Sequence, residues 1–322
     1  MTKPLSELTT IRVGGVPASL VKAFNRDALI EETQRVWATG EDWFVLGGGS
    51  NVVVADEISE LNVIKVANRG IEKVGHGAIR VQAGENWDDV VRYTVEHQLG
   101  GIESLSGIPG TMGDAPVQNI GAYGSELADV FVRCEFLDYL TGEIEIIEKA
   151  DAGFAYRDSM FKRGKLGVIT WVELQLLADL PAGSGELLKR RREEVLELRA
   201  SKGMVLSDSD LDTHSCGSFF TNPIVSSSFT RDLPDDAPAW PVDEDGKLIK
   251  LSAAWLIEKS GITKGLQLGQ SNAGVSTKHA LAITNRGGAT AKEVGELARF
   301  IQERVSNTFG ITLAPEPNFI GF

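Results

Sequence analysis

A glycine-rich segment at residues 107–124 carries the residue types that point most clearly to chemistry in this chain. It reads GIPGTMGDAPVQNIGAYG, with five glycines, two prolines and no positively charged side chain. Because glycine loosens the backbone and proline removes a hydrogen-bond donor, the segment cannot form a regular helix or strand. Its bare amides can instead approach an anion closely and cradle a group such as a pyrophosphate. Ordinary tight turns also contain glycine, but they do not need a segment of this length.

A second glycine run at residues 47–51, with the sequence GGGSN, follows an apolar stretch and offers the same chemistry. It is not a dinucleotide-binding fingerprint, because Val52 occupies the third glycine position and three valines replace the expected helix. Neither loop ends in Gly-Lys-Ser or Gly-Lys-Thr, which excludes a P-loop. Two such loops in one chain indicate a large phosphate-bearing ligand that is held by loops rather than by a helix N-terminus.

Three further segments place a group that could act in catalysis among aromatic residues or prolines. Arg157 follows a tyrosine, Ser218 precedes two phenylalanines, and Glu316 lies between two prolines. A guanidinium can hold a carboxylate through two hydrogen bonds, and a hydroxyl can donate a proton. Each residue also has a purely structural explanation: Ser218 could cap a turn, Arg157 could pair with Asp158, and Glu316 could lie on a rim.

The elements that must position these groups are short strands and helices that do not alternate strictly, which favours an α+β protein. Hydrophobic periodicity predicts helices at residues 27–37, 87–97, 186–199 and 253–259. Strands are predicted at residues 20–24, 44–46, 52–54, 63–66, 79–82, 168–177 and 280–284, and a hairpin at residues 132–140 and 143–147.

The last helix gives the clearest local prediction. Thr290 and Glu293 form a capping box before it, and Gly310 ends it. In the helix at residues 27–37, Asp27 is the predicted cap. The apolar stripe of the last helix consists of Val294, Leu297, Ile301 and Val305.

Length and composition indicate a globular protein of two or three domains, since the chain has 322 residues and 42% hydrophobic residues. The formal net charge of −13 argues against a nucleic-acid partner, because such binding depends on neutralising phosphates. The N-terminus lacks the apolar core of a signal peptide, and no apolar run is long enough to cross a bilayer. We therefore expect a cytoplasmic protein without membrane insertion.

The cysteines and histidines exclude two further classes of site. Cys134 and Cys216 are too few for a disulfide framework and fit a reducing cytosol. The four histidines are scattered without metal-ligand spacing, so no metal site is predicted. An anionic small molecule could still bind where cations collect. Candidates in the second half are Arg199, Lys202, Lys250, Lys259, Lys264 and Lys278.

Eight separated blocks make the chain resemble the UDP-N-acetylenolpyruvoylglucosamine reductase family, flavoenzymes that make UDP-N-acetylmuramate for bacterial peptidoglycan. The Tyr-Arg-Asp and Gly-Ser-Phe-Phe elements, in this order behind the long glycine loop, are its most specific part. The likeness covers almost the whole chain, at residues 9–15, 47–51, 107–124, 156–158, 217–223, 254–257, 275–280 and 316–321.

This resemblance implies a fold of the vanillyl-alcohol-oxidase/PCMH type. Two α+β subdomains would bind FAD, at residues 1–68 with 306–322 and at residues 69–200, and a third α+β domain at residues 201–305 would bind substrate. FAD would be held without a covalent bond. The resemblance assigns it to Gly47, Gly48, Gly49, Ser50, Asn51, Ser106, Gly107, Ile108, Pro109, Gly110, Gly113, Ala115, Gln118, Asn119, Gly121, Ala122 and Tyr123.

The reaction that the resemblance implies gives the three candidate catalytic residues distinct roles. NADPH would reduce FAD, and hydride would then pass to the β-carbon of the enolpyruvyl group of UDP-N-acetylglucosamine enolpyruvate. Arg157 would hold the substrate carboxylate as negative charge develops there. Ser218 would give its proton to the α-carbon, and Glu316 would help in protonated form, which burial favours. Substrate-binding residues would be Tyr156, Arg199, Lys202, Asn222, Lys264, Lys278 and His279.

Two alternatives stay open: an oxygen-using oxidase of the same flavin fold, and a non-catalytic protein that binds flavin or a sugar nucleotide. Such oxidases often tether flavin through His or Cys, and neither glycine loop contains one. A binding protein has no need of a proton donor beside a carboxylate clamp, which favours the reductase. NADPH and the enolpyruvyl nucleotide are the expected partners of a monomeric protein.

The chain departs from the family pattern in one loop. Members with the longer third domain carry a tyrosine-bearing loop after the strand that is predicted to end near Leu177, and this tyrosine folds over the substrate phosphates. Residues 180–186 are short and contain no tyrosine, although residues 226–250 retain the longer insert. An engineered shortening of this loop is one hypothesis. Because the missing group is remote from the reacting carbons, we expect weaker retention of substrate rather than lost chemistry.

Overall fold

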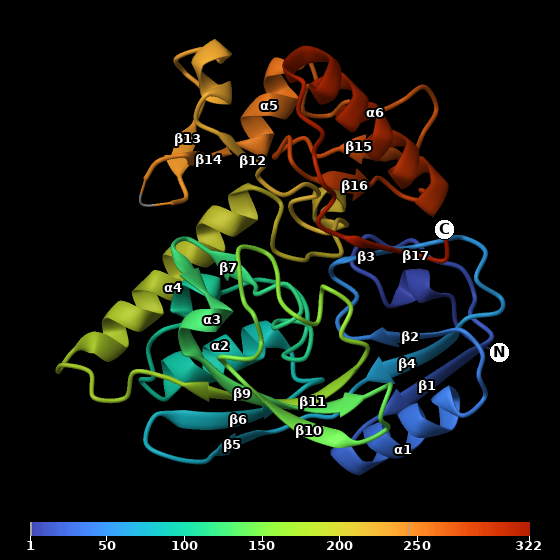
Figure 1. Ribbon diagram of the computed structural model, residues 1–322, viewed down its shortest axis with the longest axis vertical. Helices are drawn as coiled ribbons and strands as arrows, with labels where there is room; N and C mark the ends of the chain where they lie inside the picture. The colour runs from blue at the N-terminus through green and yellow to red at the C-terminus, as the bar shows by residue number, and fades with distance from the viewer. Residues whose placement is uncertain (1, 244) are drawn as a thin grey trace. The chain divides into compact units, whose positions relative to one another are not determined.

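The computed structural model describes residues 2–243 and 245–322 and divides the chain into two compact units (Figure 1). Each unit has its own cluster of buried apolar side chains. The predicted α+β mixture of strands and helices is confirmed. Unit 1 contains residues 2–4, Val16–Gly49 and Ile58–Val205, and unit 2 contains Leu5–Gly15, Ser50–Glu57 and Leu206–Phe322.

The first sheet of unit 1 is parallel and has the strand order β1-β4-β2. Helix α1 connects β1 to β2 and buries Leu29 and Val36 against the sheet. The central strand β4 is buried along most of its length, which explains its apolar sequence, and Lys65 is its one lysine. The bounds are Ser19–Ala23 for β1, Arg26–Trp37 for α1, Trp43–Leu46 for β2 and Asn62–Val66 for β4.

The predicted cap of α1 is wrong. Asn25, rather than Asp27, has the extended backbone of a cap, and its side chain accepts a hydrogen bond from the Ala28 amide at 2.8 Å. Asp27 lies in the first turn of the helix, where its negative charge interacts favourably with the positive end of the helix dipole. Both residues suit a helix start, and the composition of the segment does not distinguish them.

The second sheet of unit 1 is antiparallel throughout, with the strand order β10-β9-β11-β6-β5. The predicted hairpin is confirmed, because β9 pairs with β10 and Gly142 lies in the turn between them with φ of 70°. The bounds are Ile71–Lys73 for β5, Ala78–Gln82 for β6, Phe131–Asp138 for β9, Ile144–Glu148 for β10 and Gly167–Gln175 for β11.

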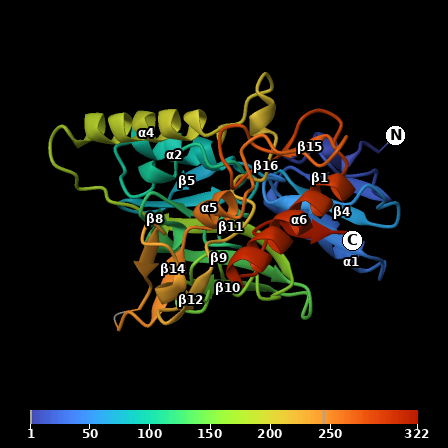
Figure 2. The ribbon, with the colours of Figure 1, turned by 90° about the horizontal axis from the view of Figure 1, so that it is seen from above.

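Helices α2 and α4 accompany this sheet, and Figure 2 shows α4 as one unbroken helix that runs alongside α2. Between α2 and β9 the chain forms the long glycine loop, with only short elements inside it. The bounds are Trp87–Glu96 for α2, Glu103–Leu105 for η2, Gly121–Ala122 for β7, Ser125–Glu126 for β8, Leu127–Val130 for α3 and Ser184–Ser201 for α4.

Unit 2 joins two early segments of the chain to its C-terminal part. Strand β3 (Val52–Val54) pairs in parallel with β17 (Asn318–Ile320), the last strand of the chain. A small antiparallel sheet has the order β12-β14-β13, and β15 pairs with β16. The remaining bounds are Leu5–Glu7 for η1, Leu211–Thr213 for η3, Ile224–Ser226 for β12, Phe229–Asp232 for η4, Ala239–Pro241 for β13, Leu248–Leu251 for β14, Ala253–Lys259 for α5, Ala273–Val275 for β15, Ile283–Asn285 for β16 and Ala291–Phe309 for α6.

Helix α6 confirms the sequence prediction in detail. Thr290 and Glu293 form the capping box, the apolar stripe is buried, and Gly310 ends the helix in the left-handed conformation with φ of 69°. The strand predicted at residues 280–284 is displaced, because β16 begins only at Ile283. A hydrogen bond from the Ala282 amide to the His279 carbonyl holds the preceding residues in a turn.

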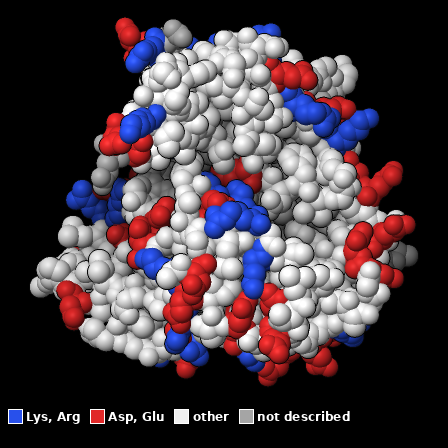
Figure 3. Space-filling view, in the orientation of Figure 1, with Lys and Arg blue, Asp and Glu red and all other residues white. Residues whose placement is uncertain are grey.

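Among the described residues, no helix combines the length and apolar character that a membrane span requires. The face drawn in Figure 3 mixes acidic and basic side chains. The whole sequence has 45 Asp and Glu and 32 Lys and Arg, so acidic residues are in excess.

Candidate functional site

The two glycine loops meet inside unit 1. A Cβ atom on Gly48 would lie only 2.8 Å from the carbonyl carbon of Gly110 and 3.1 Å from the Thr111 amide nitrogen. Real Cβ atoms do not approach backbone so closely, and therefore only glycine permits this contact at position 48. The sequence predicts one ligand for both loops. The structure brings the loops into contact, and the shared ligand stays a prediction.

Asp114 joins the two loops through its carboxylate. It accepts hydrogen bonds from the Gly48 amide at 2.5 Å, the Thr111 amide at 3.2 Å and the Thr111 hydroxyl at 2.9 Å. A side chain at Gly47 would overlap this carboxylate, which explains the glycine there. Asp114 therefore fixes the spacing between the loops, a role that the sequence prediction missed.

Lys65 of β4 lies behind the same junction and donates a hydrogen bond to the Gly47 carbonyl. Burial lowers the pKa of the Lys65 ammonium, and the nearby negative charge of Asp114 opposes that effect. The pair thus places one positive and one negative charge beneath the loops. A lysine in an otherwise apolar strand was the available signal for Lys65, and an aspartate inside the glycine loop was the signal for Asp114.

Several amides at this junction lack a hydrogen-bond acceptor among residues 2–243 and 245–322, including those of Gly49, Ile108 and Gly110. Gly49 is also buried. Because buried backbone amides are almost always paired, unpaired donors at a contact between two loops indicate a site for an acceptor from a ligand. Their arrangement suits a phosphate group, which accepts several hydrogen bonds.

Arg157 occupies a tight turn that is docked on the end of the long glycine loop. The backbones of Ala155 and Asp158 exchange hydrogen bonds, which leaves Tyr156 and Arg157 at the tip. The Arg157 guanidinium donates to the Gly121 carbonyl and, at 3.5 Å, to the Asn119 carbonyl. Asp158 pairs with Arg163.

Three residues of this region that are not glycine hold backbone conformations that favour glycine. Arg157 has φ of 53°, Asn119 has φ of 47° and Tyr123 has φ of 51°. The Asn119 side chain offsets the strain, because it donates to the Ala155 carbonyl at 3.2 Å and accepts from the Ala128 amide at 2.9 Å. Ser159 also donates to the Val117 carbonyl at 2.6 Å. The turn that carries Arg157 is therefore fastened to the glycine loop at several points.

Ser218 lies in unit 2 on a bend that its neighbours fix. Gly217 precedes it with φ of 70°, a conformation that side chains rarely adopt. Phe219 and Phe220 follow it and are fully buried, and the Phe219 amide donates to the Leu281 carbonyl at 2.8 Å. The serine itself is half-buried. The glycine turn and the two anchored rings thus hold a serine at the edge of the core.

Glu316 lies on the segment next to Ser218. Its amide donates to the Phe219 carbonyl at 2.9 Å, and Pro315 forms a backbone bridge with Phe220. The Asn51 side chain donates to the Glu316 carbonyl at 3.2 Å. Within unit 2, the structure therefore brings together the segments of Ser218, Glu316 and the end of the first glycine loop.

Arg199 is a buried cation in the last turn of α4. One guanidinium nitrogen donates to the Met204 carbonyl at 3.2 Å, and Nε has no partner among the described residues. Burial lowers the pKa of Arg199, while the Tyr123 phenol and Asp88 favour its charged form. Lys202 lies 6.0 Å from the centre of the Tyr123 ring. A buried guanidinium without a carboxylate in contact fits the predicted role of binding an anionic group.

The other predicted substrate residues lie in unit 2, and some already have partners there. The Asn222 side chain accepts a hydrogen bond from the Ala253 amide at the start of α5, and Lys278 pairs with Asp210. His279 accepts from the Leu281 amide through Nδ1, and Lys264 is exposed. Their roles toward a substrate stay predictions.

Cys216 is not a second nucleophile beside Ser218. Burial raises the pKa of its thiol to about 12, and its sulfur donates to the Val52 carbonyl. A thiol that stays protonated at neutral pH has little nucleophilic character.

The predicted cofactor residues divide between the units. Ser50 and Asn51 belong to unit 2, and the rest of the predicted set belongs to unit 1, as do Arg157 and Tyr156. Ser218 and Glu316 belong to unit 2. Since the two units are described separately, the convergence of Arg157 with Ser218 and Glu316 stays a prediction.

Comparison with known proteins identifies the family. A model described as an FAD binding domain matches residues 17–148, and the C-terminal domain of UDP-N-acetylenolpyruvoylglucosamine reductase matches residues 209–320. The UDP-N-acetylenolpyruvoylglucosamine reductase of Leifsonia xyli subsp. xyli is 46% identical over 100% of this chain and 99% of that protein. The chain belongs to the UDP-N-acetylenolpyruvoylglucosamine reductase family.

Other members of the UDP-N-acetylenolpyruvoylglucosamine reductase family agree. The reductase of Mycobacterium tuberculosis is 42% identical over 99% of this chain and 94% of its own length. The crystal structure of UDP-N-acetylenolpyruvylglucosamine reductase from Thermus caldophilus has a TM-score of 0.72 and 29% identity, over 99% of this chain and 97% of that chain. The Leifsonia alignment spans 375 positions, although this chain has 322 residues, so that relative carries segments that this chain lacks.

Membership in the UDP-N-acetylenolpyruvoylglucosamine reductase family confirms the resemblance, the predicted fold class and the FAD cofactor. The matched FAD-binding region contains both glycine loops. The unpaired amides of Gly49, Ile108 and Gly110 could donate hydrogen bonds to a pyrophosphate, so the residues present fit this cofactor. Their role in binding FAD stays a prediction.

Proposed function

We propose that this chain is an FAD-dependent reductase that uses NADPH to convert UDP-N-acetylglucosamine enolpyruvate into UDP-N-acetylmuramate, a precursor of peptidoglycan. The observation that carries the proposal is the match to a relative of that name, which covers the chain from end to end at 46% identity. The junction of the two glycine loops supports it, because its unpaired amides fit the cofactor that the reaction needs.

When bound, FAD would supply the redox chemistry, the transfer of a hydride from NADPH to the β-carbon of the enolpyruvyl group. We propose that Arg157 binds the substrate carboxylate while negative charge spreads into it from the α-carbon. Its guanidinium is permanently charged and can form two parallel hydrogen bonds. The docking of its turn on the glycine loop supports this role, because Arg157 is thereby held at the end of the segment that we propose to bind the cofactor.

The α-carbon must then gain a proton, and we propose that Ser218 supplies it. One new C–H bond at each alkene carbon balances the reduction. The bend at Gly217 and the buried rings of Phe219 and Phe220 support the assignment, because they keep the hydroxyl in one place. We propose that Glu316, on the neighbouring segment, holds a proton beside the developing charge.

We also propose three properties that rest on the family pattern. The FAD subdomains would comprise residues 1–68 with 306–322 and residues 69–200, and the substrate domain residues 201–305. The pairing of β17 with β3 supports the return of the C-terminal segment to the N-terminal part. The enzyme would be a cytoplasmic monomer.

The absorption spectrum of the purified protein tests the proposed function. We expect a yellow protein whose flavin band NADPH bleaches under anaerobic conditions and the enolpyruvyl nucleotide restores. An oxidase would regain its colour on addition of oxygen and would ignore the nucleotide. A purified protein that is colourless and takes up no FAD would end the proposal.

A further inference from the structure

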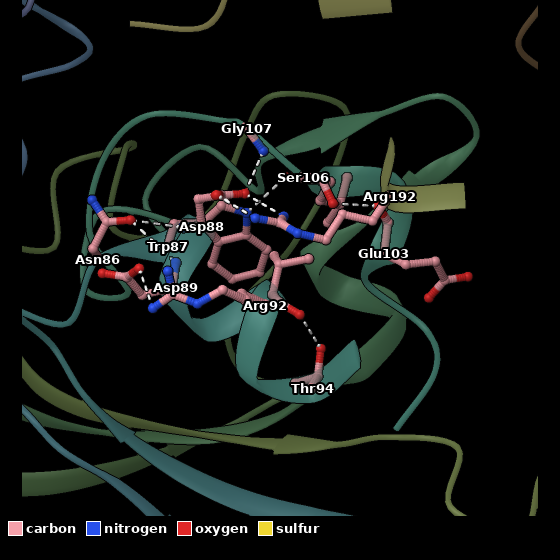
Figure 4. Close-up of polar contacts among 12 residues, drawn as sticks. Asn86, Trp87, Asp88, Asp89, Arg92, Thr94, Glu103, Ser106, Gly107 and Arg192 are labelled. Atoms are coloured by element: carbon pink, nitrogen blue, oxygen red, sulfur yellow. Dashed lines mark hydrogen bonds and ion pairs between the residues drawn. The ribbon is translucent and has the colours of Figure 1, made fainter. Parts of the chain in front are cut away.

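Asp88 connects helix α2 to two other parts of unit 1, and Figure 4 shows it between Gly107 and Arg192. Its carboxylate accepts a hydrogen bond from the Gly107 amide at 2.6 Å. Two nitrogens of the Arg192 guanidinium donate to its two oxygens, each at 2.6 Å. Gly107 opens the long glycine loop, and Arg192 belongs to α4.

This contact is of the strong kind. The paired geometry of a guanidinium and a carboxylate gives two charge-assisted hydrogen bonds, and here the Arg192 side chain is only 14% exposed. Burial acts to raise the pKa of Asp88, but the bonds from Arg192 and Gly107 outweigh it, so that the pKa lies below its ordinary value. The carboxylate also lies in the first turn of α2, where the Asn86 side chain accepts from the Asp88 and Asp89 amides.

Gly107 packs directly on α4. A Cβ at this position would lie 2.8 Å from Cδ2 of Leu196 and 3.5 Å from Nε of Arg199. Gly107 has φ of 70°, so a side chain there would be strained as well as crowded. The start of the glycine loop and the C-terminal half of α4 therefore share one contact surface, and Asp88 binds both.

The end of α4 carries the cations assigned to an anionic ligand. Arg199 lies in its last turn with Nε unpartnered in the described part of the chain, and Lys202 is the residue after the helix. Any displacement of α4 along Gly107 moves Arg199 by the same distance. The ion pair of Arg192 with Asp88 lies two turns before Arg199 and resists such a displacement.

We propose that Asp88 is a positioning residue that fixes the start of the flavin-binding loop and the anion-binding end of α4 relative to each other. The inference rests on the proposed function, because it assigns FAD to the glycine loop and a substrate anion to Arg199 and Lys202. FAD binding then depends on the hydrogen bond that the Gly107 amide donates to Asp88, and substrate binding depends on the ion pair of Asp88 with Arg192.

A role limited to the stability of α2 is the competing explanation, and Asp89 is the matched control for it. Asp89 is the next residue in the first turn of α2, and its carboxylate interacts with the positive end of the same helix dipole. Its carboxylate pairs with the exposed Arg92 at 2.9 Å and, as drawn in Figure 4, points away from Gly107. Arg190, which pairs with Glu194 on the exposed face of α4, is the control for Arg192.

The test compares Asp88→Ala, Asp88→Asn and Arg192→Gln with Asp89→Asn and Arg190→Gln, all in the full chain. The measurements are the Kd of FAD on the apoprotein, the KM for the enolpyruvyl nucleotide with kcat, and hydrogen exchange at Gly107. Asp88→Ala should raise the Kd of FAD about 10-fold or more, as expected for a lost bond between an amide and a carboxylate, and should speed exchange.

Asp88→Asn keeps an oxygen for the Gly107 amide but loses the ion pair. Like Arg192→Gln, it should raise KM about 5-fold or more, leave kcat within about 3-fold and change the Kd of FAD little. The two control variants should match the parent in all three measurements. This separation of FAD affinity from KM would not result from a general loss of stability.

The inference is overturned if Asp88→Ala and Asp89→Asn have equal effects, or if the melting temperature of Asp88→Ala falls while FAD affinity and KM stay at parental values. If Asp88→Ala fails to fold, Asp88→Asn and Arg192→Gln still decide the matter through KM. A parent protein that binds FAD but does not reduce the nucleotide would refute the proposed function instead. FAD affinity and hydrogen exchange would then still test the bond to Gly107.

Discussion

Replacing Asp114 with alanine should weaken FAD binding more than any other single change outside the loops' own glycines. The carboxylate holds the Gly48 amide at 2.5 Å and two groups of Thr111, and it thereby links the two glycine loops. A hydrogen bond to an ionised group contributes about 1.5–3 kcal/mol. If only the Gly48 bond counts, the Kd of FAD rises by about 10- to 150-fold, because 1.4 kcal/mol corresponds to tenfold.

Titration of apoprotein with FAD, followed through the quenching of flavin fluorescence, measures this change. Thermal melts give a second reading. FAD at 100 times the parental Kd stabilises the parent by about 2.7 kcal/mol, and a 100-fold rise in Kd reduces that gain to about 0.4 kcal/mol. Asp114→Asn retains an oxygen that can accept a hydrogen bond from the Gly48 amide, so its Kd for FAD should rise only a few-fold. Asp151→Asn, an exposed aspartate in the same unit, is the control.

Lys65 provides a second test. In Asp114→Ala, its partly buried ammonium loses the nearby negative charge that favours its protonated form. Lys65→Met in the Asp114→Ala background should recover part of the lost stability, so the two substitutions will not be additive. The reasoning is refuted if Asp114→Ala binds FAD as tightly as the parent, or if the stability losses of Asp114→Ala and Lys65→Met add.

Three further outcomes are expected. In Ser218→Ala, NADPH should still bleach the flavin, and the enolpyruvyl nucleotide should still bind. Stopped-flow absorbance should show that reoxidation of the flavin by the nucleotide is slowed about 10²- to 10⁴-fold. If NADPH does not bleach the flavin of this variant, the serine has a structural role. Glu316→Ala should lower kcat in steady-state assays, and a kcat within a few-fold of the parent would remove Glu316 from the proton-donating pair. Glu173 should contribute to acid unfolding. Burial acts to raise its pKa, but hydrogen bonds from Arg133 and Arg80 bring that pKa below its ordinary value. A depressed pKa in the folded state gives stability that is present above the unfolded pKa of about 4.3 and is lost as pH falls through the folded pKa. In denaturant titrations between pH 5 and 2, the free energy of unfolding of Glu173→Gln should therefore fall less steeply with decreasing pH than that of the parent. An equal slope in the two proteins would contradict the assignment.

Local signals were sufficient for much of the fold. The capping box at Thr290 and the glycine at position 310 fix both ends of α6, because the residues that decide them are adjacent in sequence. The cap of α1 was mistaken because Asn25 and Asp27 have similar preferences, and only the backbone conformation distinguishes them. The start of β16 was mistaken because apolar residues before it form a buried turn instead of pairing.

The candidate site divides in the same way. Glycine composition indicated the two loops, and the family resemblance indicated Arg157, Ser218 and Glu316. Neither gave the roles of Asp114, Lys65 and Asp88, because those roles come from partners that are distant in sequence. The sequence marks Asp114 and Lys65 as unusual at their positions, but it does not name their partners. Periodicity and composition describe a residue's near neighbours, so they do not show which distant groups a carboxylate joins.

The pairing of β3 with β17 also affects when this protein can become active. Synthesis proceeds from the N-terminus, so β3 leaves the ribosome long before its partner strand exists. Glu316 precedes β17 by two residues and arrives with it. A nascent chain therefore lacks both the strand that completes this ladder and the carboxyl group beside it until residues 316–320 have been synthesised. A polypeptide without residues 316–320 would stay in the same unfinished condition.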